Sequence, residues 1–464
     1  MPKVEFGSDG IRGIAGEWPF TSLSLVHIGQ ALGQFVCSRF EHPFVVVGRD
    51  TRPSGEDLLP CLIAGLTGQG IDVIDLGVMT TPGVAFVARR QQANLGVIVS
   101  ASHNPLEYNG IKVVGPNGLR LQREEEIEIE SLTDGYPARA VECAATPGQQ
   151  VDGQHLIEFY IQDHVARCPA KSLENLRLVL DCADGAASRV APEVFHRLGA
   201  QVLSINDDVK GKNINYRCGS EYTQQHPENL VDTVRQHCAD YGFAFDGDGD
   251  RLIVVDGDGR VYDGSDLLFV LATYFHSKGL LRNNTVITTS LANRGLIETL
   301  DRAGIRTVLA GKGDRNLEAA MWGGDYLLGS EPGGNVIIND GNHTAADAVY
   351  AALVLSGVIV SNWPSSLAAL TAWLQRRPQV TVTRKLPVVP TLEEAMQEEI
   401  RRWQRELGDS SRVLYWRSAT EPGAFRVMVE GNRESTPEQV SQLSEAICQA
   451  LQAIAEQAGE TVDR

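Results

Sequence analysis

The chain has 464 residues, of which 43% are hydrophobic and 22% are charged. This is the composition of a globular protein with several domains, and the longest apolar run, residues 348–360, is too short to cross a membrane and fits a buried helix. The formal net charge of −18 argues against nucleic acid or an anionic membrane surface as the main partner, although a local group of basic residues could still bind a small anion.

The cysteines and the N-terminal residues favour a cytoplasmic protein. Eight cysteines are scattered without a CxxC pair or a regular spacing, which is typical of reduced thiols and not of a disulfide frame or a zinc site. The opening MPKVEFGSDG has neither the basic nor the apolar region of a signal peptide. We therefore expect a cytoplasmic location.

One order of elements occurs three times along the chain: a strand, a loop, an apolar helix, a glycine and a second strand. The copies begin at residues 44–47, 178–180 and 286–287. This order is the signature of a parallel βαβ unit, so we predict an α/β fold with three similar domains whose mixed sheets lie between helices. The last part differs, with a charged helix at 392–407, two strands and a closing helix from Pro437, and predicts a smaller α+β domain. The expected domains are 1–150, 151–255, 256–375 and 376–464.

The first motif in the chain is Phe6-Gly-Ser-Asp-Gly-Ile-Arg-Gly13. Three glycines around Arg12 form a loop where backbone N–H groups and a guanidinium could approach a phosphate. Alone, this motif is weak evidence for such a site.

The second motif, GVIVSASHNPLEYNGIK at residues 96–112, joins an apolar run to a polar turn. The pattern predicts a buried strand that ends at Ser100-Ala-Ser-His-Asn-Pro105. In open α/β sheets, ligands bind outside the carboxyl ends of the strands, so a serine in this turn is a candidate for chemistry. By itself the turn is equally compatible with a polar connection that has no chemical role.

The third motif is FAFDGDGDRLIVV at residues 243–255. Its three aspartates alternate with glycines, which lets the carboxylates turn toward one centre and favours a hard cation such as Mg²⁺ or Ca²⁺. An EF-hand is excluded because the sixth position is Arg251 and not glycine, and the twelfth is Gly257 and not glutamate. The alternative is a plain Asp-Gly hairpin that binds no metal. That interpretation fits the neighbouring residues 256–259 much better than it fits residues 246–250.

The fourth motif is Arg417-Ser-Ala-Thr-Glu-Pro422, with Arg426 beyond it. Two hydroxyl groups and an arginine on a loop between strands could bind a phosphate through several donors. A polar hairpin loop without a ligand explains the segment equally well.

Together, the four motifs resemble those of the α-D-phosphohexomutase superfamily, which interconverts sugar 1-phosphates and 6-phosphates. The resemblance covers the whole chain, and it implies four domains around a central cleft. Within the superfamily, the chain is most similar to the branch of bacterial phosphoglucosamine mutases. The segments that carry this similarity are FGSDGIRG, residues 313–315, His343-Thr344 with Asp347, and residues 426–431.

The resemblance also implies roles for individual residues. Ser102 would carry the phosphoryl group, and Lys112 would move a proton if nearby charges lowered its pKa. The implied site residues are Ser102, Lys112, Arg12 and His103 for catalysis; Ser102, Asp246, Asp248 and Asp250 for one Mg²⁺; Arg251, Glu331, Gly333 and Asn335 for substrate; and Arg417, Ser418, Thr420 and Arg426 for phosphate.

Two loops depart from the family pattern. The sugar loop of that branch reads G-E-x-S-G-H, whereas this chain has Gly333 and Asn335 in place of the serine and the histidine. The phosphate loop reads R-x-S-G-T-E-P, whereas Trp416 stands here at the arginine position and Arg417 comes one residue later. Substrate choice is therefore less firmly predicted than chemistry.

The expected reaction interconverts a hexose 6-phosphate and a hexose 1-phosphate through phosphorylated Ser102 and a hexose 1,6-bisphosphate, which also serves as activator. Glucosamine 6-phosphate is the expected substrate, glucose and mannose phosphates are the close alternatives, and the protein would act as a monomer or homodimer. Two other classes remain open: a metal-dependent phosphatase that uses Ser102 as nucleophile, and a sugar-phosphate binding protein without catalysis.

Overall fold

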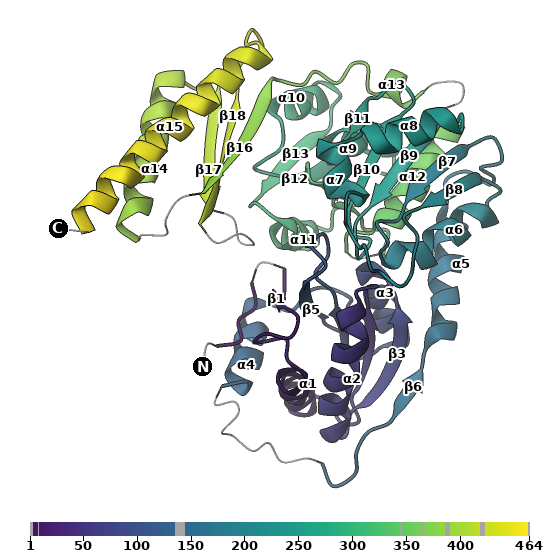
Figure 1. The fold of residues 1–464 in the computed structure, drawn as a ribbon. Coiled ribbons are helices and arrows are strands. Elements are labelled where there is room, and N and C mark those ends of the chain that lie inside the picture. The colour runs from purple at the N-terminus through teal and green to yellow at the C-terminus, as the bar shows by residue number, and fades with distance from the viewer. Residues whose placement is uncertain are drawn as a thin grey trace. The chain divides into compact units, whose positions relative to one another are not determined.

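The computed structural model describes residues 3–7, 9–134, 144–343, 345–362, 366–385, 390–417 and 423–462, without the side chains of 390–391 and 457–462. The chain divides into two compact units, residues 1–292 with 300–372 and residues 293–299 with 373–464. The first unit contains three sheets with helices against them, and the second contains one antiparallel sheet (Figure 1).

The first sheet has six strands in the order β1-β5-β4-β2-β3-β6. Strand β5 runs antiparallel to β1 and β4, while β4, β2, β3 and β6 pair in parallel. Helices α1, α2 and α4 share a hydrophobic core with one face of this sheet, and α3 packs on the other face. The elements are β1 (Ile11–Ile14), α1 (Ser22–Cys37), β2 (Phe44–Arg49), α2 (Pro53–Gly68), β3 (Asp72–Val78), α3 (Thr81–Gln91), β4 (Leu95–Val99), β5 (Tyr108–Val114), α4 (Arg123–Leu132) and β6 (Gln150–Asp152).

The second sheet has five strands in the order β11-β10-β9-β7-β8. Its parallel part, β9-β7-β8, continues into an antiparallel edge formed by β10 and β11. Helix α8 packs on one face, and Phe195 of α6 contacts Phe243 on the other, with ring centroids 5.9 Å apart. The elements are α5 (Ile157–Arg167), β7 (Arg177–Asp181), α6 (Ala191–Arg197), β8 (Gln201–Ile205), α7 (Gly219–Gln225), α8 (Glu228–Gln236), β9 (Tyr241–Phe245), β10 (Leu252–Asp256) and β11 (Val261–Tyr262).

The third sheet has four strands in the order β13-β12-β14-β15, of which only the pair β14 and β15 is antiparallel. Helix α11 packs against one face of it. The elements are α9 (Gly264–Ser277), β12 (Thr285–Thr289), α10 (Arg294–Arg302), β13 (Arg306–Ala310), α11 (Asp314–Gly323), β14 (Leu328–Ser330), β15 (Val336–Ile338), α12 (Ala348–Ser361) and α13 (Leu367–Leu370).

Polar N-caps fix where two helices near the site begin. Thr80 accepts a hydrogen bond from Gly83 N at the start of α3, and Asp347 accepts one from Tyr350 N at the start of α12. Each cap satisfies a backbone N–H that has no partner within its helix. The caps therefore hold Thr81 and Asp347 in defined positions.

The second unit is built on an antiparallel sheet in the order β16-β18-β17. Helices α14 and α15 share a core with alternate residues of β18, namely Phe425, Val427 and Val429. The elements are β16 (Gln379–Lys385), α14 (Pro390–Leu407), β17 (Arg412–Arg417), β18 (Ala424–Glu430) and α15 (Pro437–Val462).

The predicted α/β architecture is confirmed: three α/β domains and a smaller sheet domain at the C-terminal end. The exact boundaries at residues 150, 255 and 375 remain predictions.

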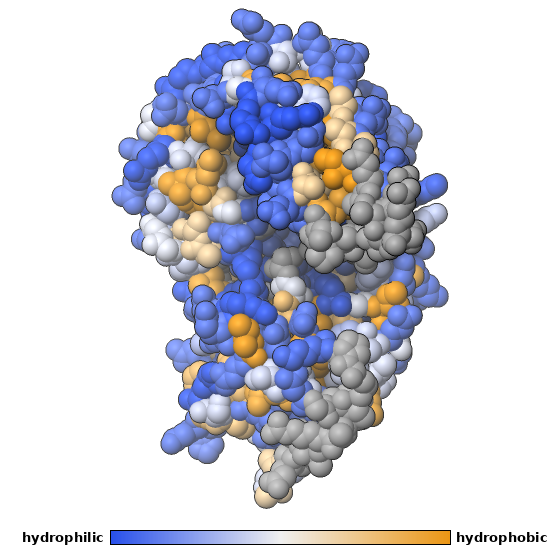
Figure 2. Space-filling view, turned by 90° about the vertical axis from the view of Figure 1, so that its left-hand side faces the viewer, coloured by the Kyte–Doolittle hydropathy of each residue, from blue (hydrophilic) through white to orange (hydrophobic). Residues whose placement is uncertain are grey.

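Among the described residues, no helix combines the length and the apolar character that crossing a bilayer requires. Cysteines 37, 61, 168, 182, 218, 238 and 448 are free thiols. Hydrophilic side chains cover most of the face in Figure 2, and hydrophobic residues lie among them in separate patches.

Candidate active site

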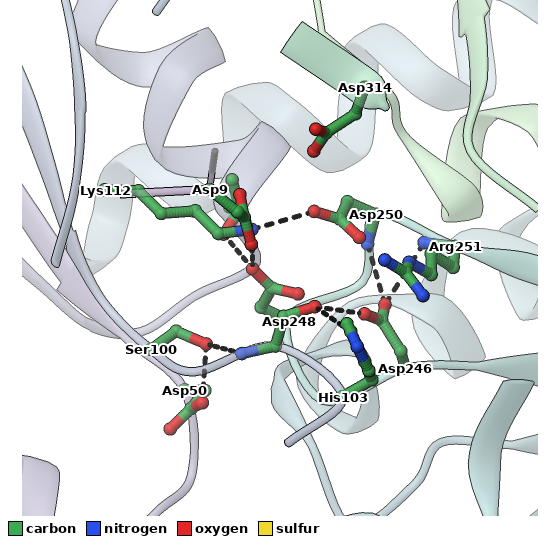
Figure 3. A network of polar contacts seen from close by, with 12 residues as sticks. Asp9, Asp50, Ser100, His103, Lys112, Asp246, Asp248, Asp250, Arg251 and Asp314 are labelled. Atoms are coloured by element: carbon green, nitrogen blue, oxygen red, sulfur yellow. Dashed lines mark hydrogen bonds and ion pairs between the residues drawn. The ribbon is translucent and has the colours of Figure 1, made fainter. Parts of the chain in front are cut away.

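Ser102 lies in the turn that follows β4, in a backbone conformation that is uncommon for a residue other than glycine. Its φ angle is +52°, in the left-handed region, and the residue is only 2% exposed. Its N–H donates to Ser100 Oγ at 2.9 Å, and Ser100 Oγ in turn donates to Asp50 Oδ2 at 2.6 Å (Figure 3). Ser102 Oγ is thereby left to contact Asp246 Oδ2 at 2.7 Å and His103 Nδ1 at 3.2 Å.

A fully buried arginine holds this turn from behind. Arg52 forms an ion pair with Asp50 at 3.0 Å and donates to the carbonyl oxygens of Ser102 at 3.0 Å and Asn104 at 2.6 Å. A buried guanidinium with several carbonyl acceptors is held rigidly, because each lost hydrogen bond would leave a charged group unpaired. The unusual backbone of Ser102 is therefore maintained by its surroundings.

The three aspartates of the predicted metal loop follow β9 and converge. One carboxylate oxygen from each of Asp246, Asp248 and Asp250 lies within 4.8 Å of the others, and all three residues are buried. Asp246 Oδ1 accepts from the N–H groups of Asp250 at 3.0 Å and Arg251 at 3.1 Å. Thr81 donates its hydroxyl to Asp248 Oδ2 at 2.5 Å.

This donor set fits Mg²⁺. Asp248 Oδ1 and Asp250 Oδ1 are buried and accept no hydrogen bond within the described structure. Buried carboxylate oxygens without donors are costly unless a cation binds them, and oxygen ligands are those that Mg²⁺ prefers. Burial, together with Asp250 and Asp248, raises the pKa of Asp246 well above its usual value, as expected for crowded carboxylates that a cation would relieve.

Lys112 reaches this acidic group from β5. Its Nζ lies 2.8 Å from Asp248 Oδ2, 2.9 Å from Asp250 Oδ2 and 3.3 Å from Asp9 Oδ1 (Figure 3). Burial opposes the charged form of Lys112, but Asp248, Asp250 and Asp9 outweigh it and raise the pKa. This is opposite to the lowered pKa that the proposed proton transfer requires, so proton transfer by Lys112 stays a prediction, one that the carboxylates around it do not favour in this site. Lys112 acts in it as a buried cation among carboxylates.

Arg12 lies beside the same network. Its NH2 group forms an ion pair with Asp9 at 2.5 Å, and Arg120 contacts the other oxygen of Asp9 at 2.8 Å. Arg120 also forms ion pairs with Asp314 and, at 3.3 Å, with Glu318 of α11. Arg120, which follows β5, therefore joins the first motif to the start of α11.

The predicted sugar loop is hydrogen-bonded to the strand that follows the metal loop. Leu252 N donates to Gly334 O at 3.0 Å, and Asn335 Nδ2 donates to Asp250 O at 3.3 Å. A side chain at Gly334 could not be accommodated, because φ is +96° and a Cβ would lie 2.6 Å from Leu252 O. Within this loop, burial raises the pKa of Glu331 to about 7, although Arg251 opposes the shift.

The second unit contains the predicted phosphate-binding residues, of which Ser418 and Thr420 lie outside the described residues. Arg417 pairs in register with Phe425, on the face that α14 covers, and its Nε donates to Glu393 of that helix at 2.8 Å. Arg426 pairs with Trp416 on the opposite face. Because side chains alternate along a strand, a shift of one residue moves a side chain to the other face. The structure therefore does not bring Arg417 and Arg426 together.

Several residues of the site were not identified from the sequence. Asp9 lies within the quoted first motif but was not assigned a role, and Asp50 and Arg52 lie in the loop after β2. The position of that loop at the carboxyl end of a strand was an available signal. Thr81 offered only the weak signal of a threonine next to the N-cap of a helix.

Comparisons with known proteins agree along the chain. Residues 3–139, 158–259 and 263–377 match the models of phosphoglucomutase/phosphomannomutase alpha/beta/alpha domains I, II and III. The phosphoglucosamine mutase of Mycobacterium ulcerans is 38% identical over 453 residues, which cover 97% of this chain and 99% of the relative. That of Neisseria meningitidis is 37% identical over 436 residues, which cover 93% and 96%.

Solved structures share the fold. A phosphoglucomutase/phosphomannomutase family protein from Burkholderia thailandensis superposes with a TM-score of 0.81 at 24% identity, covering 98% of both chains. An N-acetylphosphoglucosamine mutase from Aspergillus fumigatus, solved in complex with GlcNAc-6P and magnesium, superposes with a TM-score of 0.62 at 16% identity, covering 98% of this chain and 96% of its own.

Proposed function

The chain belongs to the α-D-phosphohexomutase superfamily and is an isomerase of phosphorylated hexoses, and on this premise we propose that it interconverts glucosamine 6-phosphate and glucosamine 1-phosphate. The relatives at 37–38% identity, which are phosphoglucosamine mutases, support this choice of sugar. The contact of 2.7 Å between Ser102 Oγ and Asp246 is the observation that carries the proposal, because it joins the predicted phosphoryl carrier to the predicted metal ligands.

In the proposed reaction, Ser102 starts as a phosphoserine. The bond between phosphorus and Ser102 Oγ breaks and a bond from phosphorus to the free hydroxyl oxygen of the sugar forms. The proton that the sugar hydroxyl loses is balanced by the proton that Ser102 Oγ gains as it becomes a hydroxyl group again. The resulting hexose 1,6-bisphosphate then reverses its orientation in the active site and returns its other phosphoryl group to Ser102 Oγ. In such transfers the protein contributes mainly positioning and charge stabilisation.

Asp246, Asp248 and Asp250, with Ser102, would hold one Mg²⁺. When bound, the ion neutralises charge on the transferring phosphoryl group. The buried carboxylate oxygens without hydrogen-bond donors support this assignment.

The neighbouring cations have complementary roles in the proposal. Lys112 balances the charge of the acidic loop, and Arg12 and Arg251 stabilise phosphate oxygens. Burial, reinforced by Arg251, lowers the pKa of His103 well below its usual value, so the ring is neutral and can share a hydrogen bond with Ser102 Oγ.

The substrate-binding assignments rest on the sugar loop and on the second unit. We assign Glu331, Gly333 and Asn335 to the sugar hydroxyl groups and Arg426 to the distal phosphate. Arg417, Ser418 and Thr420 remain predicted members of the phosphate site, and the ion pair with Glu393 makes Arg417 the weakest of them.

A coupled mutase assay tests the proposal. Glucosamine 6-phosphate, glucose 1-phosphate and mannose 1-phosphate are compared with Mg²⁺ and a trace of the matching 1,6-bisphosphate, for the wild type, Ser102→Ala and Ser277→Ala. Ser277 is an exposed serine at the end of α9 and serves as the matched control.

We expect the fastest turnover with glucosamine 6-phosphate, its loss in Ser102→Ala and normal activity in the control. Preference for glucose or mannose phosphate would refute glucosamine phosphate as the substrate. The different preference would then be attributed to the altered residues of the sugar loop. Steady release of phosphate, or activity that survives Ser102→Ala, would refute the proposed mechanism.

A further inference from the structure

A second group of metal-ligating side chains lies in the first unit, formed by His164 of α5, His343 after β15 and Asp347 at the start of α12. The three residues are 0%, 3% and 2% exposed, and one ligand atom from each lies within 4.8 Å of the others. We propose that this group binds a divalent transition metal ion, for which Zn²⁺ is the best match.

The hydrogen bonds of the two histidines determine which ring nitrogens are free to bind a metal. His164 Nδ1 lies 2.9 Å from the carbonyl oxygen of Tyr160, and His343 Nδ1 lies 3.3 Å from Asp340 Oδ1. Both neighbours can only accept, so each Nδ1 carries the proton of a neutral ring. Each Nε2 then has a free lone pair, and each is buried without a hydrogen-bond partner in the described structure.

This is the arrangement in which histidines ligate metals in proteins. A metal-binding histidine typically donates its other ring N–H to a carboxylate or a backbone carbonyl, which fixes the ring and its tautomer. His343 has the carboxylate of Asp340 in that position, and His164 has the carbonyl of Tyr160. The acceptors that would fix the orientation and the tautomer of both histidine ligands are therefore already present.

The third ligand places a negative charge beside the free nitrogens. His164 Nε2 lies 3.4 Å from Asp347 Oδ2, so a nitrogen lone pair and a carboxylate oxygen face each other. Without a cation between them, the two groups repel. Tyr160 donates its hydroxyl to the same oxygen at 2.9 Å and holds the carboxylate in place.

The surrounding charges also favour a cation. Asp163 and Asp340 lie next to the group, and both form ion pairs with Arg167, at 2.7 and 3.0 Å. With Asp347 this makes three carboxylates for one arginine, an excess that a divalent ion would balance. Two imidazole nitrogens and one carboxylate suit Zn²⁺ and not Mg²⁺, which prefers oxygen ligands, and the fourth position of a tetrahedron would be filled by water.

Aromatic packing alone does not explain the group. The ring of His343 stacks on Tyr350 with centroids 3.9 Å apart, and it also stacks on Phe86. These contacts account for a buried ring, but not for two ring nitrogens without hydrogen-bond partners that each lie near a carboxylate, His164 Nε2 at 3.4 Å from Asp347 and His343 Nε2 at 3.8 Å from Asp163. A small pocket lined by Pro82, Phe86, Asn342, His343, Ala345 and Asp347 borders the group.

The proposed site would stabilise the segments behind the active-site aspartates. Tyr160, which binds Asp347, also contacts Thr80 Oγ1 at 3.5 Å, next to Thr81. Ala348, which follows Asp347, donates its N–H to Gly249 O within the metal loop at 3.1 Å. A metal ion on the two histidines would thus hold α5 and the start of α12 against the loop that contains the aspartates.

The test measures metal uptake by the whole protein. Purified protein is stripped with a chelator, given excess Mg²⁺ to occupy the aspartate loop, and titrated with Co²⁺ and with Zn²⁺. Visible absorption of bound Co²⁺ and X-ray absorption at the zinc edge report the ligand types. The variants are His164→Gln and His343→Gln, with His237→Gln, an exposed histidine, as the control.

We expect one equivalent of Zn²⁺ with two imidazole ligands in the wild type and the control, and an affinity lower by roughly 100-fold or more in either cluster variant. If Mg²⁺ prevents all uptake, or if the bound Zn²⁺ has only oxygen ligands, the proposal is overturned and His164 forms a protonated ion pair with Asp347. Unchanged affinity in both variants would also overturn it. The wild-type spectrum decides between these outcomes even if a variant fails to fold.

Discussion

Replacing Lys112 with methionine should destabilise the first unit, and Mg²⁺ should restore much of the loss. The ammonium group lies within 3.3 Å of three carboxylates and is 5% exposed. In Lys112→Met, Asp9 keeps its ion pairs with arginine, whereas Asp248 and Asp250 lose the cation that now balances them. Removal of one partner from a buried ion pair costs about 3–5 kcal/mol.

That free-energy loss is large enough to measure by thermal unfolding. For the first unit, residues 1–292 with 300–372, an unfolding entropy of about 2.1 cal/mol/K per residue means that about 1 kcal/mol moves Tm by roughly 1.3 °C, so the loss corresponds to roughly 4–7 °C. Mg²⁺ at 100 times its dissociation constant adds about 2.7 kcal/mol to the wild type. At the same Mg²⁺ concentration the gain is larger for Lys112→Met, because its carboxylates no longer share their charge with the ammonium group and bind the ion more tightly. The deficit of Lys112→Met should therefore be largest in EDTA and clearly smaller in saturating Mg²⁺.

Calorimetry of the wild type, Lys112→Met and Lys171→Met, each with EDTA and with Mg²⁺, makes the comparison. Lys171 is an exposed lysine, and its substitution controls for the loss of one positive charge. Equal Tm values for wild type and Lys112→Met in EDTA would refute the view that the ammonium group holds the acidic loop together. A deficit of the same size with and without Mg²⁺ would show that lost packing, and not charge, is responsible.

Three further predictions concern the sugar loop and the second unit. Gly334→Ala should lower Tm by the equivalent of about 1–3 kcal/mol, because its φ is +96° and a backbone carbonyl blocks the Cβ, whereas Gly333→Ala should be nearly neutral since its Cβ would meet only a side-chain oxygen at 3.5 Å. Equal Tm values for the two variants would contradict this. Burial raises the pKa of Glu331 to about 7, so kcat/KM should rise between about pH 6 and 8 as the carboxylate forms and accepts sugar hydroxyl groups, and Glu331→Gln should remove that rise. A pH profile that Glu331→Gln leaves unchanged would assign the rise to another group. Arg426→Ala should increase KM roughly ten- to hundredfold, the loss of a charged hydrogen bond of about 1.5–3 kcal/mol, whereas Arg417→Ala should change KM far less. The reverse order would restore Arg417 as the principal phosphate ligand.

Much of the fold and the motifs that form the site could be predicted because both depend on local patterns. Strand, loop, helix and glycine recur with regular spacing, and the motifs at Ser102 and at Asp246 follow apolar strands. Parallel strands bring their carboxyl ends to one edge of a sheet, so the loops after β2 and β4, with Asp50 and Ser102, could be expected to meet there. The approach of Asp246, which follows a strand of the second sheet, could not be expected on this ground.

The electrostatics and the strand register were not predictable in the same way. The pKa of Lys112 depends on Asp9, Asp248 and Asp250, which approach it from two other segments, and the sequence does not contain their distances. Arg417 could substitute for an arginine at position 416 only if side chains did not alternate between the faces of a strand. The pairing of Arg417 with Phe425 directs its side chain toward α14. A shift of one position along β17 would place the arginine on the other face of the sheet.

The hydrogen bonds between the sugar loop and the strand after the metal loop limit how the specificity of this enzyme can change. Leu252 N and the backbone oxygen of Asp250 bind residues of the loop directly, so a loop of different shape would displace the backbone that carries the aspartates. Grafting the sugar loop of another mutase onto this chain would therefore be expected to alter the rate of phosphoryl transfer together with the choice of sugar. Evolution toward a new hexose would require compensating changes in β10 as well as in the loop.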